Sequence, residues 1–274
     1  MSIMGRRSDP TQCYIDESIH EALGFVTVSF VFAAEDLNTV VSSALASAGL
    51  DPGREEFKSG VRMKGDTRMG VVRKKLIDII NAHTRVAVVF APHPHRVPLG
   101  KQCLRALQST LIRNAIRPEG LTIHVDHGIF PSRAEAERLI GLFRFLKPAT
   151  FRPDETSHVC QGIQLADLIA HTFALIIRGA ITGSKLTKAR DSNLSQSRLA
   201  SIRYSILARC TVSEQQAFDP ATDPVVIGPE DDPAEHALHP EVFGWGVQVA
   251  PEAPDSLRGA VRGMLDRVWL GCIH

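Results

Sequence analysis

The chain has 274 residues, 44% of them hydrophobic and 22% charged, with a formal net charge of +1 at pH 7. These values are ordinary for a soluble globular protein and exclude a mostly disordered chain, and the small net charge predicts no partner. The five cysteines form no CxxC pair, which argues against a zinc site or a disulfide framework. The arginines near the N-terminus precede no apolar stretch, and no segment approaches about 18 uninterrupted apolar residues. We therefore expect a cytoplasmic protein without a membrane span.

Strand and helix patterns alternate along most of the chain. The predicted strands cover 13–16, 24–33, 85–90 and 121–126, with a short one at Phe151; the predicted helices cover 37–48, 67–82, 99–116, 132–146 and 157–178. Ser132 and Ser157 are the expected N-caps of the last two helices. Strands that alternate with helices favour an α/β fold with parallel strand pairs, although the first two strands, joined by a short turn, are expected to be antiparallel.

The C-terminal third separates its charges by sign. Residues 178–209 contain seven Lys or Arg and one acid, whereas residues 210–257 contain ten acids and no Lys or Arg. The acidic part is rich in proline, which predicts a loosely structured extension over 211–274 that ends in a short helix at 257–270. Two hypotheses stand for this extension: it competes with nucleic acid for the basic segment, or it packs on the core through Phe243, Trp245 and the terminal helix.

Three acids each interrupt an apolar segment that otherwise reads as buried core. Asp16 lies within a predicted strand, Asp126 ends another, and Asp167 lies in the apolar helix 159–178. An unpaired buried carboxylate is costly, so such a group is normally protonated, paired or bound to a cation. If the three converge, a divalent metal ion is the simplest explanation.

The helix at 159–178 carries one polar stripe on an otherwise apolar surface. Gln164, Asp167 and His171 are spaced i, i+3 and i+7, which places them on one face. This stripe indicates a functional site or a solvated edge. On the first interpretation, Gln164 lies beside the site rather than in the core.

Together these motifs resemble the bacterial "domain of unknown function 3800" family, which is assigned to the ribonuclease H-like superfamily. The resemblance rests on Asp16-Glu17-Ser18 after an apolar strand, on Glu56-Phe57-Lys58, on Asp126 after a strand, and on Ser157 followed by Gln164-Leu165-Ala166-Asp167. It covers roughly residues 11–180. It implies a mixed central sheet flanked by helices, with the element order β-β-β-α-β-α-β-α. The corresponding domain would span 11–210, with an insertion at about 35–83 between the second and third strands.

The resemblance also implies an acidic metal site built from Asp16, Asp126 and Asp167. Ribonuclease H-like nucleases usually take another acid from the first core helix, but the predicted helix 99–116 contains neither Asp nor Glu. Glu56 or Glu17 would have to replace that acid.

The first functional hypothesis is a metal-dependent nuclease or phosphodiesterase that uses one or two Mg²⁺ or Mn²⁺ ions and acts on DNA or RNA. Its supporting and phosphate-binding residues would be Ser18, Lys58, His127, Gln164 and His171 around the site, and Arg73, Lys74, Lys75, Lys185, Lys188 and Arg190 along the nucleic acid. The alternative is a non-catalytic regulatory protein that binds nucleic acid or a protein partner.

Overall fold

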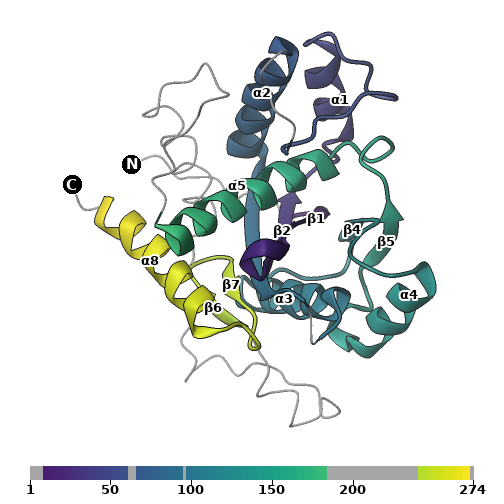
Figure 1. Cartoon of the computed structure of the whole chain (residues 1–274). Coiled ribbons are helices and arrows are strands. Elements are labelled where there is room, and N and C mark those ends of the chain that lie inside the picture. The colour runs from purple at the N-terminus through teal and green to yellow at the C-terminus, as the bar shows by residue number, and fades with distance from the viewer. Residues whose placement is uncertain (1–8, 61–65, 95–96, 184–239, 272–274) are drawn as a thin grey trace, which may run out of the picture.

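The computed structural model describes residues 9–60, 66–94, 97–183 and 240–271. Its centre is a seven-stranded sheet (Figure 1) with the order β5-β4-β1-β2-β3-β7-β6. The strands are β1 (Gln12–His20), β2 (Phe25–Ala33), β3 (Thr84–Pro92), β4 (Thr122–Asp126), β5 (Thr150–Glu155), β6 (Glu241–Phe243) and β7 (Val247–Val249).

The sheet is mixed. β1, β2 and β3 form an antiparallel meander, whereas β4 lies parallel to β1, and β5 lies parallel to β4. On the other edge β7 lies parallel to β3, and β6 is antiparallel to β7. The predicted class, α/β with a mixed central sheet flanked by helices, is confirmed, and the elements from β1 to the helix after β5 follow the order that the family resemblance implies.

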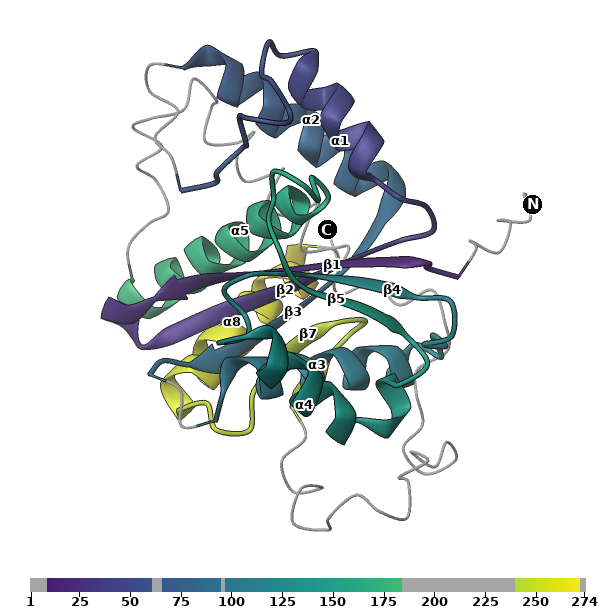
Figure 2. The same cartoon turned by 90° about the vertical axis from the view of Figure 1, so that its right-hand side faces the viewer.

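Helices cover both faces of the sheet (Figure 2). One face carries α1 (Asn38–Ala46), α2 (Thr67–His83), α5 (Ile163–Thr182) and α8 (Asp255–Gly271); the other carries α3 (Leu99–Arg113), α4 (Arg133–Leu142) and the 3₁₀ turn Arg144–Leu146. Because side chains alternate along a strand, β1 sends Tyr14 and Asp16 toward α5, and Cys13 and Ile15 toward α3. The two faces therefore have separate cores.

Three predicted boundaries were wrong in ways that matter for the site. β1 does not end at Asp16 but continues to His20, because its pairing with β2 is unbroken until the 3₁₀ turn Glu21–Leu23. The helix predicted from Ser157 begins at Ile163, and the Ser157 hydroxyl binds the Glu56 carboxylate instead of capping a helix. The helix predicted over 132–146 breaks at Phe143, although Ser132 does cap its start by accepting from the Glu135 N–H.

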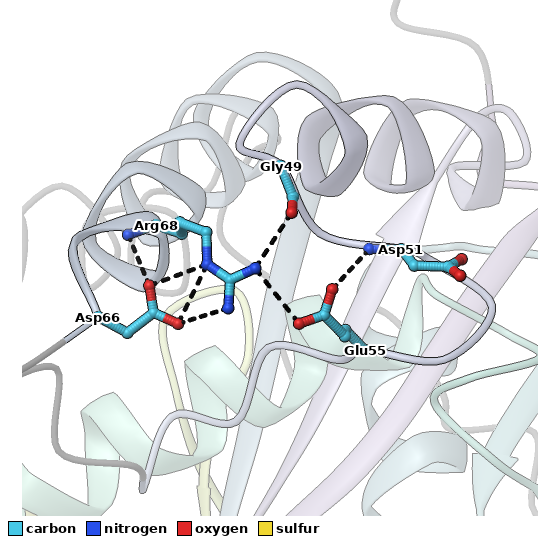
Figure 3. Close-up of polar contacts among 5 residues, drawn as sticks. All are labelled: Gly49, Asp51, Glu55, Asp66 and Arg68. Atoms are coloured by element: carbon cyan, nitrogen blue, oxygen red, sulfur yellow. Dashed lines mark hydrogen bonds and ion pairs between the residues drawn. The ribbon is translucent and has the colours of Figure 1, made fainter.

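The insertion between β2 and β3 is organised around Arg68 (Figure 3). Its guanidinium binds Asp66 Oδ2 at 2.8 Å and the Gly49 carbonyl at 3.1 Å, and lies 3.4 Å from Glu55. The other Glu55 oxygen accepts from the Asp51 N–H at 2.9 Å. Single exposed ion pairs contribute little stability, but this network fixes both ends of the loop that continues into Glu56.

The C-terminal segment joins the same fold. Trp245 is buried with its ring edge-on to Phe32, at a centroid distance of 5.6 Å. Helix α8 packs beside α5 through Leu257, Val261 and Leu265, as its periodicity predicts. The predicted loose extension missed β6 and β7. The acidic stretch before them and the basic segment after α5 lie outside the described residues.

Within the described ranges, α5 alone is long and apolar enough to cross a membrane by length and composition. Buried core helices meet the same criterion. Here the helix packs against β1, β2 and α8.

Candidate metal centre

Two neighbouring parallel strands place the first two carboxylates side by side. Ile15 pairs with Val125, so Asp16 and Asp126 follow at the same level of the sheet. Both side chains are buried. One oxygen each from Asp16, Glu17 and Asp126 can be chosen so that all three lie within 4.8 Å of one another.

Helix α5 brings the fourth acid, Asp167. Ser29 of β2, which pairs with Asp16, donates its hydroxyl hydrogen to the Ala166 carbonyl at 2.7 Å and so fixes the helix on the sheet at this level. Asp167 Oδ2 accepts from the Ser59 N–H of the insertion loop at 2.8 Å. Asp167 is close enough to Asp16 to raise the pKa of that carboxyl. We call Asp16, Glu17, Asp126 and Asp167 the carboxylate cluster.

Glu17 reaches the cluster from the opposite face of β1. Its carboxylate lies against Gly128, where any Cβ would clash with it. Its Oε2 atom is buried and has no hydrogen-bond partner in the described part of the chain. Since α3 supplies no acid on this face, Glu17 is the residue that completes a group of four carboxylates here.

Burial and mutual repulsion disfavour charge on these groups. Burial raises the pKa of Asp16 well above its usual range, and Glu17, Asp126 and Asp167 raise it further. The pKa of Glu17 rises to about 7, mainly through burial and then through Asp126. Burial also raises the pKa of Asp167, against the opposing effect of the Ser59 N–H. Without a cation, part of the cluster must hold protons at neutral pH.

Glu56 lies beside Asp167 rather than among the other carboxylates. It is held by the Ser157 hydroxyl, lies 3.4 Å from Lys58 Nζ and 3.6 Å from His158 Nε2, and its charge raises the pKa of Asp167. Burial disfavours the charged form of Lys58, but Glu56, Asp167 and Asp16 outweigh it and raise the pKa of its ammonium group. Lys58 is exposed at the edge of the cluster, where it can meet an anionic ligand.

The expectation that Gln164 lies outside the core was wrong. Its side chain is fully buried, accepts from the Phe57 N–H at 2.9 Å and donates to the Ser157 carbonyl at 3.0 Å. Gln164 therefore ties the insertion loop to the turn before α5, and the polar stripe that includes it is split between a structural amide and the Asp167 carboxylate.

The other predicted residues are spread around the cluster. His127 is exposed, with Nδ1 3.2 Å from Asp126 Oδ2, and Ser18 lies 3.3 Å from His20 Nε2. Burial, with Arg73 and His20, lowers the pKa of His171 to about 4, so its ring is neutral at pH 7. Arg73, Lys74 and Lys75 belong to α2, whereas Lys185, Lys188 and Arg190 lie outside the described residues.

The sequence reasoning missed Ser29, Ser59 and Gly128. A readable signal existed only for Gly128, which follows Asp126 and His127 directly. The other two act through a backbone carbonyl and a backbone N–H, so their positions depend on tertiary contacts between distant segments.

The cluster fits a hard divalent cation. Four carboxylates, the unpartnered Glu17 Oε2 and the raised pKa values of Asp16, Glu17 and Asp167 all indicate negative charge that lacks a counterion. Mg²⁺ and Mn²⁺ prefer oxygen ligands of this kind.

No protein-family model matches the chain, and neither does any curated protein. The resemblance to the family named above therefore stays a prediction. Among solved structures, the chain is similar to "Structure of the PCNA:RNase HII complex from Archaeoglobus fulgidus" (14% identity, TM-score 0.38), with 76% of this chain and 96% of that chain covered. It is also similar to ribonuclease H2 from Pyrococcus horikoshii OT3 (16% identity, TM-score 0.35), with 70% of this chain and 98% of that chain covered. A mutant of Bst-RNase HIII gives 14% identity and a TM-score of 0.36, with 73% and 70% covered. At these scores the similarity identifies no family.

Proposed function

We propose that the protein is a metal-dependent phosphodiesterase that cleaves nucleic acid at the carboxylate cluster. The observation that carries the proposal is the convergence of Asp16, Glu17 and Asp126 within 4.8 Å, with Asp167 beside them. The similarity of the element order to that expected of ribonuclease H-like nucleases supports it. The three described cysteines are free and buried, which is consistent with the expected cytoplasmic location.

The proposed metal ligands are Asp16, Asp126 and Asp167, with Glu17 as the fourth carboxylate. Divalent ions bound there would supply an activated water and stabilise the negative charge that develops on a phosphodiester. His127 is exposed and 3.2 Å from Asp126, so it can hold a proton at the mouth of the site. Lys58, and further away the cations of α2, would bind the phosphate backbone.

The test is cleavage of single-stranded and duplex DNA, RNA and hybrid substrates in Mg²⁺ or Mn²⁺. Asp126→Asn should lower the rate by roughly 100-fold or more, as expected when a group that stabilises the transition state is removed. Asp78→Asn, at an exposed position on α2, is the matched control and should leave the rate unchanged. Metal-dependent cleavage that survives Asp126→Asn would refute the proposal. Binding of nucleic acid without cleavage in either metal would instead favour a non-catalytic regulatory protein.

A further inference from the structure

A second group of potential ligands lies on the α5 face of the sheet, at the start of β1 and β4. One ligand atom each from His124, Glu155 and Cys160 can be chosen so that all three lie within 4.8 Å of one another. They border an open pocket of about 310 Å³ that also includes Gln12, Asn38 and Arg152. We propose that His124, Glu155 and Cys160 bind a zinc-class divalent ion, separately from the carboxylate cluster.

The backbone irregularity in β5 brings Glu155 into this group. His124 pairs with Arg152, but Asp126 pairs with Glu155, so β5 has one residue more than β4 over this stretch. Asp154 takes up the difference with a positive φ of 66°. This bulge turns Glu155 toward His124, whose Nδ1 lies 2.6 Å from Glu155 Oε2.

The turn before α5 brings in Cys160. Gly162 lies so close to the Tyr14 ring that any Cβ would clash with it, and Tyr14 stacks on His124 at a centroid distance of 5.0 Å. The Gly162 N–H also donates to Asn38 Oδ1 at 2.9 Å, and the Asn38 side chain hydrogen-bonds the Cys160 sulfur. Tyr14 and Asn38 thus fix the ring and the thiol relative to each other.

The hydrogen bonds of His124 are those of a metal ligand. Nε2 lies 3.0 Å from Gln12 Oε1, which can accept its hydrogen and leave Nδ1 for the ion. Nδ1 and Glu155 Oε2 are then two lone-pair-bearing atoms 2.6 Å apart, and they need a proton or a cation between them. In this site the ion takes the place of that proton.

The donor set selects the class of ion. A thiolate and an imidazole are softer ligands than carboxylates, so they favour Zn²⁺ or Co²⁺ over Mg²⁺. Tetrahedral zinc places its N, O and S ligands roughly 3.3–3.6 Å apart. The group would therefore contract slightly while Nδ1 and Oε2 separate by less than about 1 Å. The pocket leaves room for water as a fourth ligand.

Titration of the chelator-treated full-length protein with Co²⁺ tests the site, because thiolate coordination gives a sulfur-to-cobalt charge-transfer band in the near ultraviolet. We expect the band to saturate at one equivalent and to disappear when Zn²⁺ is added. Cys160→Ser should abolish it. Cys13→Ser, which alters another buried thiol on the opposite face of β1, should retain it.

Two further variants keep the test decisive if Cys160→Ser does not fold. Glu155→Gln keeps the thiol and should raise the Co²⁺ dissociation constant by about tenfold or more. Asp16→Asn should leave the band intact, because Asp16 belongs to the other site. Absence of the band in the wild-type protein, its persistence in Cys160→Ser, unchanged Co²⁺ affinity in Glu155→Gln, or its loss in Asp16→Asn would overturn the proposal.

Discussion

At the scale of single residues, the dominant feature is negative charge held together by the backbone. Adjacent residues of β1 point to opposite faces of the sheet, yet Asp16 and Glu17 both reach Asp126 because β4 ends there. Burial removes the water that would screen them. The result is a set of carboxyls whose pKa values are raised, and whose ionisation a cation would favour.

The stability of the metal-free protein should therefore fall as the pH rises. Glu17 has a pKa of about 7 in the folded protein and an ordinary value of 4.5, so the folded state binds the proton more tightly. The stabilisation is full below about pH 4.5 and is lost as the pH rises through about 7. Asp16 and Asp167 act in the same direction. Thermal unfolding in chelator between pH 5 and 8 measures this. Saturating Mn²⁺ should reverse the loss, and a melting temperature that rises with pH in chelator would contradict the prediction.

Glu17 and Glu56 should differ in their effect on metal affinity. Glu17→Gln removes a carboxylate from the group within 4.8 Å, whereas Glu56→Gln changes a residue already held by Ser157 and Lys58. We expect Glu17→Gln to weaken Mn²⁺ binding by more than about tenfold and Glu56→Gln by less. Calorimetric titration of both variants decides the matter, and the reverse order would assign the fourth carboxylate to Glu56.

Gly128 should be required for the position of Glu17. In Gly128→Ala the new methyl group would occupy the place of the Glu17 carboxylate, which can rotate away at small cost in stability. Mn²⁺ affinity should then fall about tenfold while the melting temperature changes little. Gly141→Ala on α4, where a Cβ meets nothing within 4 Å, is the control and should not alter metal binding. Equal Mn²⁺ affinities in the two variants would contradict this role.

At the scale of elements, the insertion loop and the turn before α5 depend on Gln164. Gln164→Leu would leave the Phe57 N–H and the Ser157 carbonyl buried without partners. Each such loss costs about 1–3 kcal/mol, so the free energy of unfolding should fall by at least that amount. Denaturant unfolding measures it. Gln161→Leu, whose amide contacts the nearby His158 carbonyl at 2.8 Å, should have a smaller effect. A Gln164→Leu variant of unchanged stability would show that the clamp is dispensable.

The sequence predicts the elements whose pattern is local. The β-branched run in β2 and the periodicity of α2 place these elements within one or two residues of their ends. It misplaces the start of α5 because the Ser157 hydroxyl, typical of a helix cap, binds Glu56 from a segment about 100 residues away. It misses β6 and β7 because three-residue strands carry almost no pattern of their own.

The same distinction applies to the site. Asp16, Asp126 and Asp167 stand out because each interrupts an apolar segment, and the structure brings them to one place. Gln164 interrupts its segment equally, but backbone groups of two loops satisfy it inside the core. A single sequence cannot distinguish a buried polar residue with protein partners from one that awaits a ligand. The His124, Glu155 and Cys160 group depends on a bulge, which no periodicity reveals.

At the scale of the whole molecule, residues 240–271 belong to the main body of the protein. Trp245 packs on Phe32 and lies under the Arg85 guanidinium, whose carbon is 5.9 Å from the ring centroid. Trp245→Ala should cost about 3–5 kcal/mol of unfolding free energy. Chemical denaturation measures this loss, and Phe243→Ala, at a partly buried position on β6, should cost less. A near-neutral Trp245→Ala would mean that the C-terminal strands are only loosely attached.

The position of β7 also determines what the sheet offers to other chains. Without it, β3 would be an edge strand nine residues long, with the apolar sequence Val86-Ala87-Val88-Val89-Phe90 at its centre and unpaired backbone groups open to a second copy. In the intact protein the outermost strands are β6, with three residues, and β5, interrupted by its bulge and by Pro153. Neither is a good template for strand addition. Loss of the C-terminal segment would thus expose a surface prone to aggregation.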